Sequence, residues 1–233
     1  MKRIGLIGGM SWESSIEYER IINEEVRRRL GGTHSADLVI RSFDFARIEQ
    51  LQEAGDWTAA GELLSGAARD LEQFGAELLV LCTNTMHRLA PEITNAVTIP
   101  FLHIADATAI HVQRAGLSTV GLLGTRYTME AEFYKGRLIE QHDLDVLTPD
   151  EAGRDEVHRI IYDELVRGEI NDDSRQRYID IVHTLVARGA EGIIAGCTEI
   201  ELLLSAEDVP VPYFPTTRLH ATAAVDLALA SES

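Results

Sequence analysis

Short apolar runs alternate with longer amphipathic stretches along the whole chain. The runs have the length of buried strands, and the stretches repeat apolar residues at helical spacing. Residues 4–8 open this pattern as a strand, and residues 14–30 follow as a helix with Ile21, Ile22 and Val26 on one face. Strands and helices that alternate through short connections are typical of parallel sheets covered by helices. The pattern therefore predicts an α/β protein.

The same periodicities place the remaining elements. The expected further strands are 37–42, 78–81, 99–104, 119–123, 144–147, 192–195 and 211–214. The expected further helices are 57–74, 88–97, 105–115, 128–142, 151–167, 173–188, 199–204 and 216–230. Gly75 and Gly116 each follow an expected helix, where a glycine commonly ends one.

A weak internal repeat divides this pattern into two halves. Residues 4–8 (IGLIG) resemble residues 120–124 (VGLLG) at an offset of 116, and residues 75–77 (GAE) recur at 189–191 at an offset of 114. Two matches at nearly one offset favour a duplicated α/β unit over chance. We expect a first domain of residues 1–100 plus 208–233, to which the last strand and helix return, and a second domain of residues 101–207.

The repeat makes the two cysteines inequivalent. Extended without gaps from the second match, it aligns Cys82 with Gly196 and Thr83 with Cys197. Thr83 and Cys197 both stand where a strand ends, and ligands of open α/β sheets collect at such ends. We expect Thr83 and Cys197 on opposite walls of one cleft. Cys82 lies one residue earlier on its strand, so its side chain should point the other way.

The residues that follow the expected strands 78–81 and 192–195 each allow a functional and a structural interpretation. A cysteine at a helix N-terminus has a lowered pKa and reacts as a thiolate, although free cysteines are more often buried packing. Thr198 and Glu199 directly after Cys197 favour a functional role. Thr83, Asn84 and Thr85 are suited to hold a carboxylate, or simply to cap a helix. For His87, the sequence leaves open whether it orients a site or lies on a helix face.

Composition narrows the classes of function. The 233 residues carry a net charge of −17, which argues against nucleic acid as a partner. Lysine is confined to Lys2 and Lys135, which argues against pyridoxal phosphate as a cofactor.

No metal-ligand spacing or dinucleotide-binding loop occurs in the sequence. Gly8-Gly9 better suits a turn that offers backbone N–H groups to a small anion. Two cysteines and no long apolar run predict a soluble cytoplasmic protein without membrane contact.

Four segments together resemble the aspartate/glutamate racemase family. They are IGLIGGMSWES at the start, LCTNTMH, LLGTRYTME, and GCTEIELL near the end. The resemblance implies two similar parallel α/β domains related by pseudo-two-fold symmetry, with the active site in the cleft between them, and a homodimer that needs no cofactor. It also implies racemisation of an acidic amino acid, in which one cysteine removes the α-proton and another returns a proton from the opposite face.

The resemblance assigns roles by position. Cys197 matches the family cysteine that acts on the L-enantiomer, and the other family cysteine is replaced here by Thr83. A hydroxyl is a poor base but can donate a proton, so turnover from the L-enantiomer should exceed turnover from the D-enantiomer. The implied substrate-contacting positions are Met10, Gln52 in a substrate loop, Asn84, Thr85, Thr125, Thr128, Thr198 and Glu199. Arg47, Arg126 and Arg167 are candidates to bind a side-chain carboxylate.

Two other classes of function stay open at this point. A sister enzyme of the same fold could be a cis–trans isomerase, in which cysteine adds to a double bond, or a decarboxylase. An amino-acid sensor could keep the site after losing one base, and the missing first cysteine supports that alternative. The sequence also does not decide whether the substrate is aspartate, glutamate or a broader range of amino acids.

Overall fold

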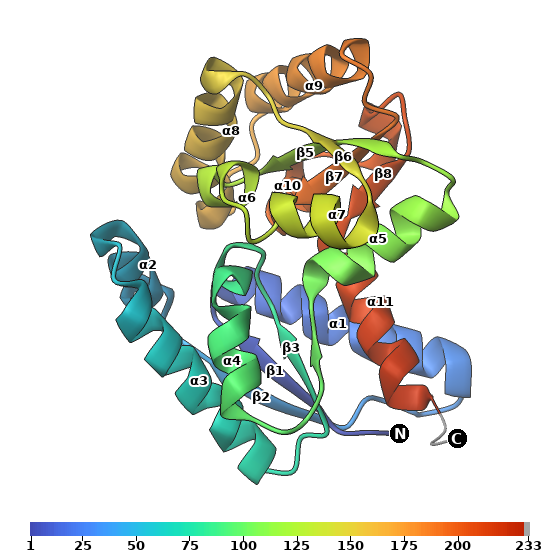
Figure 1. The fold of residues 1–233 in the computed structure, drawn as a ribbon. Helices are drawn as coiled ribbons and strands as arrows, with labels where there is room; N and C mark the ends of the chain where they lie inside the picture. Colours follow the sequence, from blue (N-terminus) through green and yellow to red (C-terminus); the bar gives the residue numbers. More distant parts are fainter. Residues whose placement is uncertain (231–233) are drawn as a thin grey trace. The chain divides into compact units, whose positions relative to one another are not determined.

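The computed structural model describes residues 1–230, and its chain divides into two compact units. Unit 1 comprises residues 1–104 and 220–230, and unit 2 comprises residues 105–219. Each unit is built on one four-stranded parallel sheet with interleaved helices (Figure 1). The α/β class predicted from the sequence is confirmed. Residues 231–233, which the expected first domain includes, lie outside the described residues.

Unit 1 contains the sheet β2-β1-β3-β4. Its strands are β1 (Ile4–Gly8), β2 (Leu38–Ser42), β3 (Leu78–Leu81) and β4 (Phe101–Leu102). Its helices are α1 (Trp12–Leu30), α2 (Phe45–Ala54), α3 (Trp57–Gln73), the 3-10 helix η1 (Thr85–Leu89), α4 (Ala90–Ala96) and most of α11 (Thr216–Leu229). α5 (Ile104–Arg114) begins at the last residue of unit 1 and continues into unit 2.

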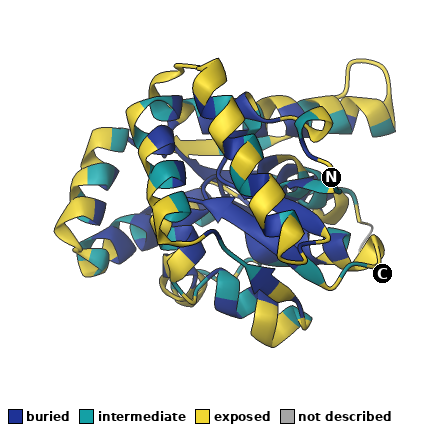
Figure 2. Cartoon of the chain, turned by 90° about the horizontal axis from the view of Figure 1, so that it is seen from above, coloured by how far each residue is buried: buried dark blue, intermediate teal, exposed yellow. Residues whose placement is uncertain are grey.

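Successive side chains of β3 point to opposite faces of the unit 1 sheet. Leu79 and Leu81 pack in a hydrophobic cluster that includes α3 residues such as Leu64. Leu78 and Val80 pack in the other cluster, to which α1 and α11 contribute. The central strands β1 and β3 are buried, β4 is intermediate and the edge strand β2 is intermediate to exposed, and the outer faces of the helices are exposed (Figure 2). The period-2 alternation thus decides which side chains at the strand end face which layer.

Unit 2 repeats this topology with the sheet β6-β5-β7-β8. Its strands are β5 (Thr119–Gly124), β6 (Asp145–Leu147), β7 (Gly192–Gly196) and β8 (Tyr213–Pro215). Its further helices are α6 (Arg126–Glu130), α7 (Lys135–His142), α8 (Glu151–Asp163), η2 (Leu165–Arg167), α9 (Asp172–Ala187), α10 (Ile200–Leu203) and η3 (Ala206–Asp208).

Matched hydrogen bonds support the duplication inferred from the sequence. In unit 1 the Glu77 carboxylate accepts from the N–H of Arg3 at 2.8 Å, and the Glu77 N–H donates to the Arg3 carbonyl. In unit 2 the Glu191 carboxylate accepts from the N–H of Thr119 at 3.0 Å, and the Glu191 N–H donates to the Thr119 carbonyl. The recurring Gly-Ala-Glu therefore has the same task in both units, which is to join the start of one strand to its neighbour.

Three expectations about the elements are wrong. Helix α2 was not expected, although Asp44 caps it and Gly55 ends it in a left-handed conformation. The expected helix 128–142 is two helices, because the backbone becomes extended at Ala131. The expected boundary at 207/208 assigns β8 to the first domain, whereas β8 pairs with β7 in unit 2 and only α11 returns to unit 1. Within residues 1–230, no helix is long and apolar enough to cross a membrane.

Candidate active site

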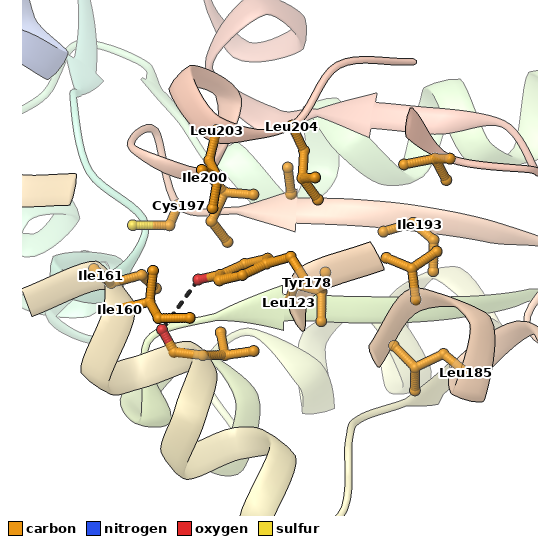
Figure 3. Packing of buried hydrophobic residues seen from close by; sticks show 14 of the residues in the cluster. Leu123, Ile160, Ile161, Tyr178, Leu185, Ile193, Cys197, Ile200, Leu203 and Leu204 are labelled. Atoms are coloured by element: carbon orange, nitrogen blue, oxygen red, sulfur yellow. Dashed lines mark hydrogen bonds between the residues drawn. The ribbon is translucent and has the colours of Figure 1, made fainter. Parts of the chain in front are cut away.

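Cys197 follows the last residue of β7 and lies at one end of the unit 2 hydrophobic core. Its side chain is 8% exposed and belongs to the same cluster as Tyr178 and Ile193. Figure 3 shows the sulfur beyond the Tyr178 hydroxyl, at the opposite end of the cluster from Leu185. The thiol donates to the Glu199 carboxylate, with 2.9 Å between Sγ and Oε2. Cys197 therefore combines an apolar support with a hydrogen-bonded carboxylate.

The prediction of a lowered Cys197 pKa is wrong. Burial raises the pKa of the Cys197 thiol well above its ordinary value, and the negative charge of Glu199 raises it further. The helix that follows, α10, has four residues. So short a helix has a small dipole, which cannot offset desolvation beside a carboxylate. The group at rest is a thiol that donates a hydrogen bond to Glu199.

Thr83 holds the equivalent position in unit 1. The parallel register pairs Ile7 with Leu81 in one sheet and Gly124 with Gly196 in the other. Cys82 continues the first pairing, since its N–H donates to the Ile7 carbonyl at 2.9 Å. Cys82 thus corresponds to Gly196 and Thr83 to Cys197, as the ungapped repeat predicts. Thr83 is buried, with 7% of its side chain exposed.

Cys82 is a core residue. It is fully buried in the cluster formed with α1 and α11, together with Leu78 and Val80. Burial raises the pKa of its thiol. Its orientation follows the strand alternation predicted from the sequence, so Cys82 is a packing residue and the thiol suited to chemistry is Cys197.

Polar residues next to Thr83 and Cys197 are buried as well. In unit 1, Asn84 and Thr85 follow Thr83 and begin the 3-10 helix η1. In unit 2, Thr198 and Glu199 are 8% and 7% exposed. Their hydroxyl, amide and carboxylate groups are of the kinds that can hydrogen-bond a polar ligand.

The turn after β1 brings the backbone of two strand ends together in unit 1. Gly9 has a φ of +84°, and a Cβ there would lie 2.2 Å from the backbone N of Phe43, which follows β2. The next residue, Met10, is buried in the cluster that contains Phe43. Ser11 caps α1 by accepting from the N–H of Ser14 at 3.5 Å. Glycine is required at position 9 because any side chain would collide with Phe43.

Thr125 and Thr128 form the corresponding turn after β5 in unit 2. Thr125 caps α6 by accepting from the Thr128 N–H at 3.3 Å, and the two hydroxyl oxygens lie 3.2 Å apart. The adjacent strand ends approach closely, because a Cβ on Gly124 would lie 2.9 Å from the Gly196 carbonyl oxygen. The hydroxyls of this turn and Cys197 therefore follow two strands, β5 and β7, that are directly paired.

Gln52 differs from its expected setting. It lies on helix α2 instead of in a loop, it is 6% exposed, and its Nε2 donates to the sulfur of Met86 at 3.0 Å. Among the arginine candidates, Arg126 pairs with Asp155 at 2.5 Å, whereas Arg47 and Arg167 are exposed. Arg126 is exposed as well, so its ion pair with Asp155 is a surface pair of small energy.

Three histidines of unit 1 gather behind Thr83 in a group that the sequence did not reveal. His87, His103 and His220 are all buried, and the His87 ring centroid lies 4.6 Å from that of His103 and 5.6 Å from that of His220. They come from η1, from the residue after β4, and from α11. The positions of these histidines in the sequence do not predict the cluster, because only the fold brings the three side chains together.

Other features do not add to the candidate site. An open groove of about 520 Å³ between α3 and α4 is lined by none of the residues predicted to contact substrate. Across residues 1–230, no group of three or more His, Cys, Asp or Glu side chains is arranged to hold a metal ion.

Comparisons with known proteins agree on one family. The model of the Asp/Glu/Hydantoin racemase family matches residues 7–224. A candidate Asp/Glu racemase from Yersinia pestis is 55% identical, with a TM-score of 0.93 over 99% of this chain and 100% of that one. An aspartate racemase homologue from Pyrococcus horikoshii OT3 is 33% identical, with a TM-score of 0.86 over the same shares. The broad specificity amino-acid racemase RacX of Bacillus subtilis is 23% identical over 73% of each chain.

Proposed function

Because the chain belongs to the Asp/Glu/Hydantoin racemase family, we propose that it racemises acidic amino acids, aspartate or glutamate, without a cofactor. The observation that carries the proposal is the equivalence of Thr83 and Cys197 at the ends of β3 and β7. Two proton-transfer groups that follow equivalent strands of duplicated units suit racemisation, in which a proton leaves one face of the α-carbon and a proton is added to the opposite face. Cys197 acts on the L-enantiomer and Thr83 on the opposite face.

The first half of the reaction uses the contact between Cys197 and Glu199. The thiol proton passes from Sγ to Glu199 Oε2, which lies 2.9 Å away. The resulting thiolate removes the α-proton of the L-amino acid and becomes a thiol again. The substrate's own α-ammonium group favours this step, because a nearby positive charge lowers the pKa of a buried thiol. The carbanion so formed has no cofactor to accept its charge.

The carbanion is stabilised by neutral donors. As the α-proton leaves, negative charge moves onto the substrate carboxylate, and preorganised N–H and O–H groups bind that carboxylate more strongly than before. Asn84, Thr85 and Thr198 carry suitable side chains. Met10, Gln52, Thr125 and Thr128 complete the proposed substrate contacts, with Glu199 beside the thiol. Arg47, Arg126 and Arg167, all exposed, are the arginines proposed to meet the side-chain carboxylate.

The second half of the reaction differs from the first because Thr83 is a hydroxyl. Its Oγ1–H gives a proton to the carbanion on the opposite face, and the alkoxide left behind takes a proton from solvent while Glu199 releases one. A hydroxyl donates to a carbanion far more easily than it removes an α-proton. At saturating substrate, turnover from the L-enantiomer therefore exceeds turnover from the D-enantiomer, whereas kcat/KM is equal in both directions because the equilibrium ratio of enantiomers is near 1:1.

Incubation of the purified protein with single L-amino acids, followed by chiral chromatography, tests the proposal. We expect the D-enantiomer to accumulate from aspartate or glutamate, and C197S to produce none. Racemisation of neutral amino acids at equal rates would instead indicate the broad range for which RacX is named. Binding of an acidic amino acid without turnover would support a sensor, an alternative favoured by the replacement of the first cysteine by Thr83.

We further propose that the enzyme is a cytoplasmic homodimer with no nucleic-acid or membrane partner. The net charge of −17 supports the absence of nucleic-acid binding, because phosphate backbones require a basic surface. Sedimentation equilibrium of the purified protein tests the oligomeric state, and a mass near 25.8 kDa would contradict the dimer.

A further inference from the structure

The Thr83 carbonyl is held by a buried imidazole. His87 Nδ1 lies 2.6 Å from the carbonyl oxygen of Thr83, and the His87 ring is 1% exposed. A carbonyl oxygen can only accept, so Nδ1 carries the hydrogen of this bond. On its other side, His87 Nε2 accepts from the backbone N–H of Ile104 at 3.2 Å. The two partners together require the neutral ring with its proton on Nδ1.

Neighbouring groups hold His87 in this state. Burial lowers its pKa well below the ordinary value, and His103 and His220 would add repulsion to a charged ring. The His220 ring is fixed in the same cluster, since its Nε2 donates to the Leu102 carbonyl at 3.0 Å and its Nδ1 lies 2.8 Å from the Tyr18 hydroxyl oxygen. A ring that cannot ionise or rotate without losing a buried hydrogen bond is a rigid support.

The position of His87 connects this support to the reacting group. His87 lies four residues after Thr83, so its ring closes the turn from the end of β3 into η1. Its second partner, Ile104, is the last residue of unit 1 and the first residue of α5. One ring thus ties the Thr83 peptide to a residue on another element, beyond the end of β4.

We propose that His87 is a positioning residue for Thr83, whose peptide it holds between the end of β3 and the start of α5 so that the hydroxyl delivers its proton in one direction. This inference rests on the proposed function. His87 does not act on the substrate in this scheme. Its removal therefore lowers proton donation by Thr83 and leaves proton removal by Cys197, which is on the other unit, intact.

Two isosteric substitutions separate the two hydrogen bonds of the ring. The asparagine amide group lies as far from Cβ as imidazole Nδ1, so H87N retains a donor for the Thr83 carbonyl and loses the contact with Ile104. The glutamine amide group reaches the place of Nε2, so H87Q retains the contact with Ile104 and loses the donor for Thr83. The pair forms a matched control, because each variant removes one polar contact from the same buried ring.

The experiment incubates wild type, H87N and H87Q with L-aspartate or L-glutamate in D₂O. Loss of the Cα–H signal reports removal of the α-proton, and chiral chromatography of the same samples reports the D-enantiomer formed. We expect H87Q to lower the ratio of D-enantiomer formed to α-proton lost by about fivefold, the effect of one lost hydrogen bond. H87N should retain a ratio close to that of wild type.

Three outcomes overturn the inference and are distinguishable. A proportional fall of both quantities in H87Q would make His87 a merely structural residue and leave the proposed function standing. No loss of Cα–H with wild type would overturn the proposed function and the inference with it. Long-range ¹H–¹⁵N spectra of wild-type protein add a test that needs no variant, because a His87 ring protonated on Nε2 would contradict the bond to Thr83.

Discussion

Cys197 donates its thiol hydrogen to Glu199, with 2.9 Å between Sγ and Oε2, within one turn of chain. The turn is closed by the Ile200 N–H, which donates to the Cys197 carbonyl at 3.2 Å. This contact decides how the thiol can act as a base. The pKa of the Cys197 thiol is raised by burial and by the Glu199 carboxylate, so a free thiolate is scarce. The reaction therefore depends on a group that accepts the thiol proton before the α-proton is removed.

Replacement of Glu199 by glutamine should therefore slow removal of the α-proton. The amide keeps the size of the side chain but is a very weak base, and loss of a positioned proton acceptor costs about 10²-fold or more. Measured as Cα–H exchange in D₂O across pH 6–10 or so, the residual rate of E199Q should rise with pH, since the thiol must then ionise on its own.

Glu201 offers the matched control for that variant. Its carboxylate accepts from the Thr217 N–H at 2.9 Å, a bond that the oxygen of a glutamine side chain can keep. E201Q should retain most of the exchange rate and the pH profile of wild type. Equal losses in E199Q and E201Q would mean that negative charge near the thiol matters and that the contact with Glu199 does not.

Substitution of Thr83 by cysteine should give the enzyme a base on each face of the substrate α-carbon. A thiol can remove a proton where a hydroxyl cannot, so the rate from the D-enantiomer should rise by on the order of 10²-fold, whereas T83S should resemble wild type. Initial rates from each enantiomer, followed by chiral chromatography, provide the measurement. A D-enantiomer rate that T83C leaves unchanged would place Thr83 outside the reaction.

Much of this arrangement could be predicted from the sequence. The equivalence of Thr83 and Cys197 follows from two short matches, because the period-2 geometry of strands carries a register over several residues. The Cys197 pKa could not be predicted, since it depends on how deeply the thiol is buried and on where Glu199 points. The loop setting expected for Gln52 came from the family resemblance, whereas the signals for α2 are its cap Asp44 and the terminating Gly55. The histidine group depends on contacts between residues far apart in the sequence.

The two cysteines should respond differently to truncation. C82A removes a fully buried sulfur from the unit 1 core and should lower the free energy of unfolding by about 1–2 kcal/mol, with racemisation retained in the folded protein. C197A should abolish racemisation with a smaller effect on stability, because its side chain lies at the end of its cluster. Urea unfolding and chiral chromatography on both variants test this, and loss of activity in folded C82A would contradict it.

Acidification should lower the stability of unit 2 by protonating the Glu156 carboxylate. This carboxylate accepts from Arg159 at 3.0 Å and from Arg177, and these bonds lower its pKa to about 2. The folded-state pKa lies below the unfolded value of about 4.3, so the stabilisation is present above pH 4.3 or so and is lost as pH falls toward about 2. Because both arginines are partly exposed, its size is about 1 kcal/mol.

Urea unfolding at successive pH values measures this effect. E156Q should be less stable than wild type near neutral pH and should lose less stability on acidification. Glu169, an exposed carboxylate outside this ion-pair group, provides the control, and E169Q should follow the wild-type curve. Parallel curves for wild type and E156Q would contradict a stabilising role for the pair.

The central claim is that Cys197 removes the α-proton of the L-enantiomer and Thr83 supplies a proton on the other face. Proton NMR of L- and D-substrates in D₂O with wild type, C197A and T83A tests it most directly. We predict that wild type exchanges the α-proton of the L-enantiomer much faster than that of the D-enantiomer, that C197A exchanges neither, and that T83A still exchanges the L-enantiomer while forming little D-product. Exchange that persists in C197A, or wild-type exchange that is equally fast from both enantiomers, would contradict the claim.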